Sequence, residues 1–182
     1  MNPNEALAKE HEFMLGKLNE FEAIINQLPK NPDLNRLKEV FKDIWDAEAH
    51  HKKEEQVFFK LLEDDGKNLS VKIMKKEHRD MKKAKEVLKE VIDDGNMEII
   101  KSLLLFEGKF LIHKMRDHIM KEDEILYPAV LDLIQSEDWF KIREQFDSIG
   151  YCCSGTKTKK KVSNFEVNKG YINDEPLSMD SD

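Results

Sequence analysis

Two His-x-x-x-Glu pairs are the residues best suited to chemistry in this sequence: His50 with Glu54, and His118 with Glu122. Residues four apart share one face of a helix, so each pair presents an imidazole and a carboxylate in the same direction. Imidazole nitrogens suit iron, manganese, zinc or copper, and carboxylates offset the charge of the cations they bind. The pairs therefore indicate metal binding. Because 37 of the 182 residues are acidic, two such pairs alone are a weak signal.

The metal-binding interpretation of these pairs is strengthened by an internal repeat, because the chain resembles itself at about half its length. His50–Phe58 aligns with His118–Leu126 at a separation of 68 positions, and Glu10–Met14 aligns with Glu77–Met81 at a separation of 67. A two-helix unit therefore occurs twice, with one histidine on its first helix and a His-x-x-x-Glu pair on its second. Packed antiparallel, the two units gather six candidate metal ligands in one interior: His11, His50, Glu54, His78, His118 and Glu122.

These six residues predict a site for two metal ions. Four imidazoles and two carboxylates buried without metal would carry a desolvation cost on the order of several kcal/mol. Two carboxylates can instead bridge two cations and leave coordination positions open for a small ligand. We expect two iron ions, with manganese or zinc as alternatives. A second pair, His51 and Glu55, lies beside the first, and a small rotation of the helix would favour it instead; His113 is interpreted as a spectator.

Four segments carry apolar residues at helical spacing, and breaker-rich stretches separate them. The expected helices cover residues 4–28, 33–63, 70–93 and 97–134, and a short turn of helix is expected at 139–146. Connections of a few residues favour antiparallel neighbours, so the sequence predicts an all-α, up-down-up-down four-helix bundle built from two repeated hairpins. The bundle should occupy residues 1–148. Residues 149–182 are expected to form a poorly ordered, flexible C-terminal tail that could recruit a protein partner.

Composition argues against several other classes of protein. The net charge is -7 and the lysines are interleaved with acidic residues, so no nucleic-acid footprint is visible. The longest uncharged apolar run, Ser102–Phe106, is far shorter than the roughly 20 residues of a membrane span, and the first residues are too polar for a signal peptide. We therefore expect a cytoplasmic protein that binds neither nucleic acid nor membrane. The adjacent Cys152 and Cys153 cannot staple a fold and are interpreted as reduced bystanders.

Four stretches of the sequence carry a family resemblance. They fall within residues 7–130 and are Glu10-His11, His50-His51-Lys52-Lys53-Glu54-Glu55, Glu77-His78, and the run from His118 to Pro128. In these stretches the chain resembles the hemerythrin-like, HHE cation-binding domain family. The resemblance implies a four-helix bundle around a non-haem di-iron centre that binds dioxygen or reactive nitrogen and oxygen species, or handles iron.

Two positions depart from the oxygen-carrying members of that family. Lys82 stands four residues after His78, where those proteins usually have a second histidine. His118 and Glu122 are four residues apart, whereas the carriers space their histidine and aspartate by five. The resemblance therefore does not extend to a five-histidine carrier site.

The leading hypothesis is a non-haem di-iron protein that binds or senses a small diatomic ligand, oxygen or nitric oxide, or reactive species, or that handles iron. The residues described above are explained without assigning the protein an enzymatic activity. The alternative is a ferritin-like di-iron oxidase or peroxidase, although ferritin-like sites are richer in carboxylate and use Glu-x-x-His motifs. A third hypothesis is a metal-free interaction bundle whose tail, with its Lys159–Lys161 run, recruits partners.

Overall fold

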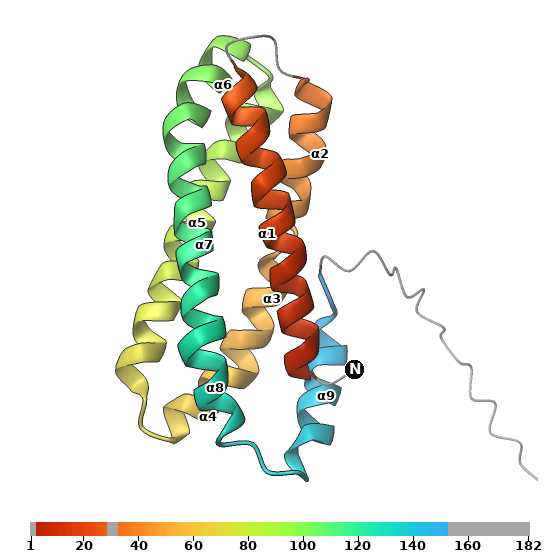
Figure 1. Cartoon of the computed structure of the whole chain (residues 1–182), viewed down its shortest axis with the longest axis vertical. Helices are drawn as coiled ribbons and strands as arrows, with labels where there is room; N and C mark the ends of the chain where they lie inside the picture. The colour runs from red at the N-terminus through yellow and green to blue at the C-terminus, as the bar shows by residue number, and fades with distance from the viewer. Residues whose placement is uncertain (1–2, 29–32, 153–182) are drawn as a thin grey trace, which may run out of the picture.

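The computed structural model describes residues 3–28 and 33–152, and within them every regular element is helical. The all-α prediction is therefore confirmed. The helices form four arms that lie side by side, and successive arms run in opposite directions along the long axis (Figure 1). The arms are α1 (Pro3–Gln27); α2 (Leu34–Trp45) with α3 (Glu48–Lys53), η2 (Glu54–Phe58) and α4 (Phe59–Asp64); α5 (Asn68–Asp94); and α6 (Met97–Leu103) with η3 (Leu104–Gly108), α7 (Lys109–Lys121), η4 (Glu122–Leu126) and α8 (Tyr127–Leu131).

Local sequence signals account for where the arms begin and end. The Asp33 side chain accepts hydrogen bonds from the first backbone N–H groups of α2, and Asn96 does the same for α6. Gly66 and Gly95 follow α4 and α5 with φ angles of 84° and 78°, a left-handed conformation that glycine adopts without strain. The second and fourth arms each contain a π-helical turn that begins at a glutamate of a His-x-x-x-Glu pair. Such turns are frequent at functional sites.

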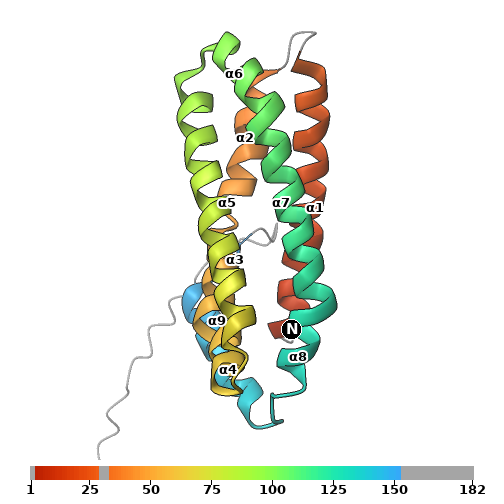
Figure 2. The same cartoon turned by 90° about the vertical axis from the view of Figure 1, so that its left-hand side faces the viewer.

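Two apolar clusters form the core and leave a polar layer between them. One fills the end near α6 and includes Phe21, Phe41 and Leu111. The other fills the opposite end, near α4 and α8, and includes Phe58 and Leu126 (Figure 2). The histidines and glutamates of the repeat occupy the layer between these clusters.

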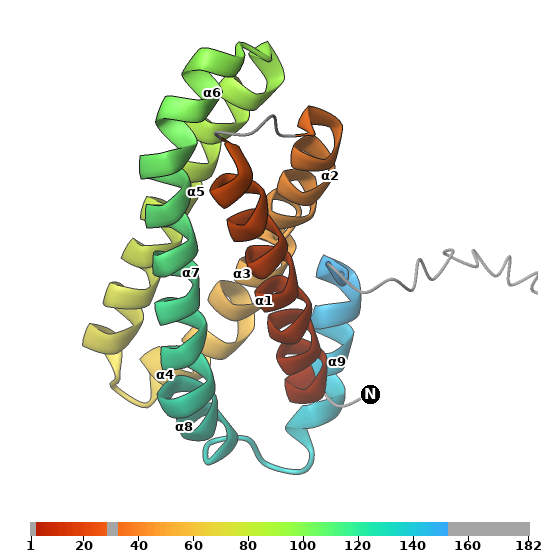
Figure 3. The same ribbon diagram turned by 45° about the horizontal axis from the view of Figure 1, so that its top comes forward.

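A further helix, α9 (Asp138–Ile149), lies along the lower parts of α1 and α3 (Figure 3). It is longer than the turn expected at 139–146, and it buries Ile142 and Phe146 against the lower cluster. Beyond α9 the described chain continues to Cys152, whose side chain is buried. The rest of the predicted tail, including Cys153 and the Lys159–Lys161 run, lies outside the described residues.

Membrane insertion was not expected from the sequence. Among the helices of residues 3–28 and 33–152, none combines the length and the apolar character that crossing a bilayer requires.

Candidate metal centre

The structure brings all six predicted ligands together in the interior, and each is at most 4% exposed. They come from every arm: His11 from α1, His50 and Glu54 from the second arm, His78 from α5, and His118 and Glu122 from the fourth arm. Their ligand atoms fall into two overlapping groups, within each of which all lie within 4.8 Å of one another. We call these the first half-site (His11, His50, Glu54 and Glu122) and the second half-site (His51, Glu54, His78 and His118).

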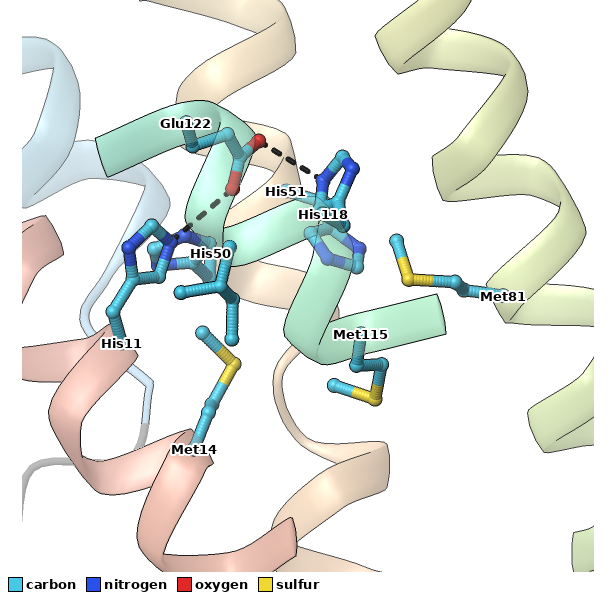
Figure 4. A pocket seen from close by; sticks show the side chains of 9 residues that line it. His11, Met14, His50, His51, Met81, Met115, His118 and Glu122 are labelled. Carbon is cyan, nitrogen blue, oxygen red and sulfur yellow. Dashed lines mark ion pairs between the residues drawn. The ribbon is translucent and has the colours of Figure 1, made fainter. Parts of the chain in front are cut away.

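The two glutamates connect the half-sites. Glu122 lies between His11 and His118, with its two carboxylate oxygens 3.2 and 2.9 Å from their Nε2 atoms (Figure 4). Glu54 makes the matching connection, with one oxygen 3.2 Å from His50 Nε2 and the other 3.5 Å from His78 Nε2. Each carboxylate therefore faces one imidazole of each half-site, which is the arrangement needed to bridge two cations.

A carboxylate on the outer side of each ring fixes the orientation of the four predicted histidines. Each Nδ1 donates a hydrogen bond of 2.7 to 2.9 Å to a carboxylate from another helix. The pairs are His11 with Asp123, His50 with Glu10, His78 with Glu55, and His118 with Glu77. Metal-binding histidines characteristically have such partners, which fix the tautomer and raise the basicity of the inward nitrogen.

Two of these outer carboxylates are themselves held by lysines at equivalent positions of the repeat. Lys53 is fully buried and its Nζ lies 2.5 and 2.7 Å from the two oxygens of Glu10. Lys121 Nζ lies 2.7 Å from Glu77 in the second unit. Glu10 also accepts a 3.1 Å hydrogen bond from the backbone N–H of Cys152. The supporting groups therefore follow the same two-fold repeat as the candidate ligands.

The inward-facing histidine and glutamate atoms form a set of acceptors, and the Tyr127 hydroxyl donates to one of them, Glu54. Because each Nδ1 carries the donated hydrogen, each Nε2 of a neutral ring presents a lone pair to the interior. His78 Nε2 and His118 Nε2 face each other at 2.8 Å, and one oxygen of Glu54 and both oxygens of Glu122 have no hydrogen-bond partner among the described residues. Converging lone pairs repel unless a cation lies between them. The donor set therefore fits metal ions, and protons are its alternative occupants.

The pKa values of the buried histidines show that the surrounding carboxylates create a negative electrostatic potential in the interior. Burial opposes the charged form of His50, yet Glu54 and Glu10 raise the pKa of His50 to about 10. Burial likewise opposes the charged form of His78, and Glu122 and Glu55 raise its pKa to about 9. The surrounding imidazoles lower the pKa of both Glu54 and Glu122 despite complete burial. A site that attracts protons this strongly also favours a divalent cation, whose binding releases them.

His51 also lies in the interior, so the choice between His50 and His51 does not arise. The His51 ring stacks on that of His78 at a centroid distance of 4.1 Å, and the residue belongs to the second half-site. Burial and the neighbouring His78 lower the pKa of His51 to about 3, which leaves its imidazole neutral and able to bind metal. Glu55, the other member of the second pair, instead lies outside the interior behind His78. The structure thus gathers five imidazoles, the fifth coming from α3.

The two half-sites differ at two equivalent positions of the repeat. The His11 ring stacks on Tyr127, whereas the corresponding ring of His78 stacks on Phe59. The Tyr127 hydroxyl donates to Glu54 and lies 3.2 Å from His11 Nε2 and 3.4 Å from His50 Nε2. Ile119 occupies the position that corresponds to His51. The first half-site therefore has a phenol that the second lacks, and the second has an imidazole that the first lacks.

Sequence reasoning assigned no outer carboxylate its role behind a histidine and did not single out Tyr127, although the repeated Glu-His dipeptides at 10–11 and 77–78 were a usable signal for Glu10 and Glu77. His113 is exposed and lies outside the cluster, as expected of a spectator. The Cys152 sulfur lies within 4.8 Å of ligand atoms of Glu10 and His50.

Fold and site together define a helical protein whose interior holds a His/Glu cluster able to bind metal ions. Residues 2–130 match the hemerythrin HHE cation binding domain, and the chain belongs to this family. Comparison with curated proteins finds no match.

Proposed function

We propose that this protein holds two iron ions, one in each half-site, inside an up-down-up-down four-helix bundle, and binds a small diatomic ligand such as oxygen or nitric oxide there. The proposal is carried by one observation. Imidazole Nε2 atoms and the oxygens of Glu54 and Glu122 converge, with the Tyr127 hydroxyl donating to one oxygen of Glu54, while outer carboxylates hold the Nδ1 atoms. Under this proposal the ligands are His11, His50 and His51, with His78 and His118, and Glu54 and Glu122 serve both ions.

The mixture of ligand types supports iron. Five imidazoles and two carboxylates suit iron, while manganese or zinc remain chemical alternatives for the same donors. Bound iron would supply open coordination positions and accessible oxidation states for a diatomic ligand. The role of the protein is to orient the imidazoles through Glu10, Glu55, Glu77 and Asp123, and to exclude bulk water with the apolar clusters on either side.

A binding or sensing role is favoured over catalysis by the surroundings of the site. The space enclosed by the ligands is lined by Met14, Met81 and Met115 (Figure 4) and leaves no room for an organic substrate beside the imidazoles. Histidines outnumber carboxylates among the proposed ligands, unlike the carboxylate-rich sites of ferritin-like oxidases. The oxidase or peroxidase hypothesis is therefore tested as an outcome of the experiment below.

The experiment measures metal content and ligand stoichiometry on one preparation. After anaerobic reconstitution, elemental analysis should find about two iron atoms per chain, because seven ligands are shared by two half-sites. The reduced protein should then respond to oxygen or nitric oxide with one optical change that saturates at the stoichiometry of the iron. Less than about half an iron per chain would refute the metal site. Continued oxygen consumption with a supplied reductant would instead identify an enzyme.

A further inference from the structure

A surface pocket of about 220 Å³ opens directly over the second half-site. It lies between the second arm and α5, and its walls are formed by Glu48, His51, Lys52, Glu55, His78, Arg79 and Lys82. Two of these residues, His51 and His78, are members of the second half-site. The pocket therefore ends on the candidate ligands themselves.

The His51 ring separates this pocket from the interior. The same side chain lines the enclosed space between the half-sites, together with His11, His50 and His118 (Figure 4). Its Nδ1 has no hydrogen-bond partner among the described residues, and the nearest carboxylate oxygen, on Glu48, is 3.7 Å away. His51 is thus the one imidazole of the described cluster whose Nδ1 makes no hydrogen bond to a carboxylate.

The rim of the pocket carries positive charge. Lys52, Arg79 and Lys82 are exposed, and none has an ion-pair partner within the described part of the chain. The two carboxylates of the pocket are already engaged, because Glu48 pairs with the buried Lys85 and Glu55 pairs with His78. Three unpaired cations beside two compensated carboxylates attract anions.

Comparison of the two repeat units shows that this rim belongs to one side only. The positions that correspond to Lys52, Arg79 and Lys82 in the other unit are Met120, Glu12 and Leu15. The three cations are therefore absent from the equivalent face beside His11. Bundle packing cannot require them, since the same packing is achieved on the other side with apolar and acidic residues.

We propose that this pocket is the entrance through which a small monovalent anion, of the size of azide or nitrite, approaches the second half-site, with His51 and His78 forming the inner wall of the pocket. The inference rests on the proposed function and adds the route by which a charged ligand approaches the site. Lys52, Arg79 and Lys82 concentrate the anion at the rim, directly beside His51 and His78.

The first test compares two single charge reversals on α5. Lys82→Glu alters the rim, while Lys83→Glu makes the same change at an exposed neighbour outside the pocket. With the ferric protein at low ionic strength, stopped-flow optical measurements should show azide association slowed about fivefold by the first change and unaltered by the second. Added salt should remove the difference, and association of uncharged nitric oxide should be the same in both variants. Equal azide rates in the two variants at low salt would overturn the entrance.

The second test needs no metal. Nitrite titrated into the metal-free chain at low salt should shift the backbone amide resonances of Lys52, Arg79 and Lys82, and Lys82→Glu should abolish these shifts while Lys83→Glu keeps them. Unshifted rim resonances would refute the pocket as an anion site. A chain that fails to hold iron yet binds nitrite at the rim would refute the proposed function alone. Iron binding with unshifted rim resonances would refute only the entrance.

Discussion

Replacing Tyr127 with Phe removes one hydroxyl from the middle of the first half-site and distinguishes two roles for it. Tyr127 is 3% exposed, and its hydroxyl donates to Glu54 while lying within 3.4 Å of His11 and His50. In the metal-free protein this hydroxyl is, among the described residues, the neutral donor that faces these acceptors. A metal ion in the first half-site would face the same Glu54 and histidine atoms. The phenol is then either displaced by the ion or bound to it.

The loss of stability expected for the metal-free Tyr127→Phe variant follows from the burial of Glu54. Without the hydroxyl, one buried oxygen of Glu54 keeps only His50 Nε2, at 3.2 Å. Loss of a hydrogen bond to a buried charged group costs about 1.5–3 kcal/mol. For a domain of this size each kcal/mol lowers the melting temperature by about 2–4 °C, so the metal-free variant should melt roughly 3–12 °C below the wild type.

The metal affinity should move in the opposite direction. An ion bound to Glu54 replaces the lost hydrogen bond, so the variant is destabilised less with metal than without it. Each 1.4 kcal/mol of this difference raises the affinity about tenfold. Tyr127→Phe should therefore bind its first metal ion roughly tenfold more tightly than the wild type. Calorimetric melting of the metal-free chain and competition with a chelator measure the two quantities.

Two outcomes would refute this reasoning. A metal-free Tyr127→Phe variant that melts with the wild type would show that the hydroxyl contributes nothing to the site. An affinity that falls by about tenfold or more would show that the phenol itself binds the metal. Tyr151→Phe is the matched control, because its hydroxyl bonds Asp147 at the surface and should leave both quantities unchanged.

Two further predictions concern the ligands and the bound ions. His118→Ala should lose at least one metal ion per chain, because it removes the imidazole that lies between Glu77 and Glu122, whereas the exposed His113→Ala should keep full metal content by elemental analysis. Equal losses in the two variants would contradict the ligand assignment. Removal of metal by a chelator should lower the melting temperature in calorimetry, since ions that bind only the folded chain stabilise it. An unchanged melting temperature after complete removal would argue against a buried site.

The inward-facing residues of the site were accessible to sequence reasoning because helical periodicity and the repeat both constrain them. Four apolar stripes each contained a histidine at an equivalent position, and the family match over residues 2–130 agrees with that pattern. The outer carboxylates were harder to foresee. Asp123 reaches His11 and Glu55 reaches His78 from different helices, and such contacts depend on how far each helix is rotated. Periodicity alone does not specify that rotation.

His51 illustrates a second limit of prediction from the sequence, which concerns the choice between adjacent residues of one helix. Sequence reasoning treated His50 and His51 as alternatives, because adjacent residues on a helix point about 100° apart. In the structure α3 lies between two other arms, and the two rings face different neighbours. His50 bonds Glu10 on α1, whereas His51 stacks on His78 of α5. Both can therefore enter the interior, which becomes evident only once the neighbours of α3 are known.

The segment from α9 to Cys152 provides the final prediction, because it links the end of the described chain to the first half-site. Phe146 of α9 is fully buried and packs on Phe58 with a centroid distance of 5.6 Å. The N–H of Cys152 donates to Glu10, which in turn holds His50. A chain that ends after Ser136 should therefore lose stability and also loosen one candidate ligand.

The stability loss can be worked from burial. Ile142 and Phe146 are 4% and 0% exposed, and burying such side chains contributes about 1.5–3 kcal/mol each, so the shortened chain should be roughly 3–6 kcal/mol less stable. Its metal loss should be confined to the first half-site, since Glu55 and Glu77 still hold His78 and His118. A chain ending after Cys152 is the control and should match the full chain in melting temperature and iron content. Full iron content in the shorter chain would show that Glu10 orients His50 without help from Cys152.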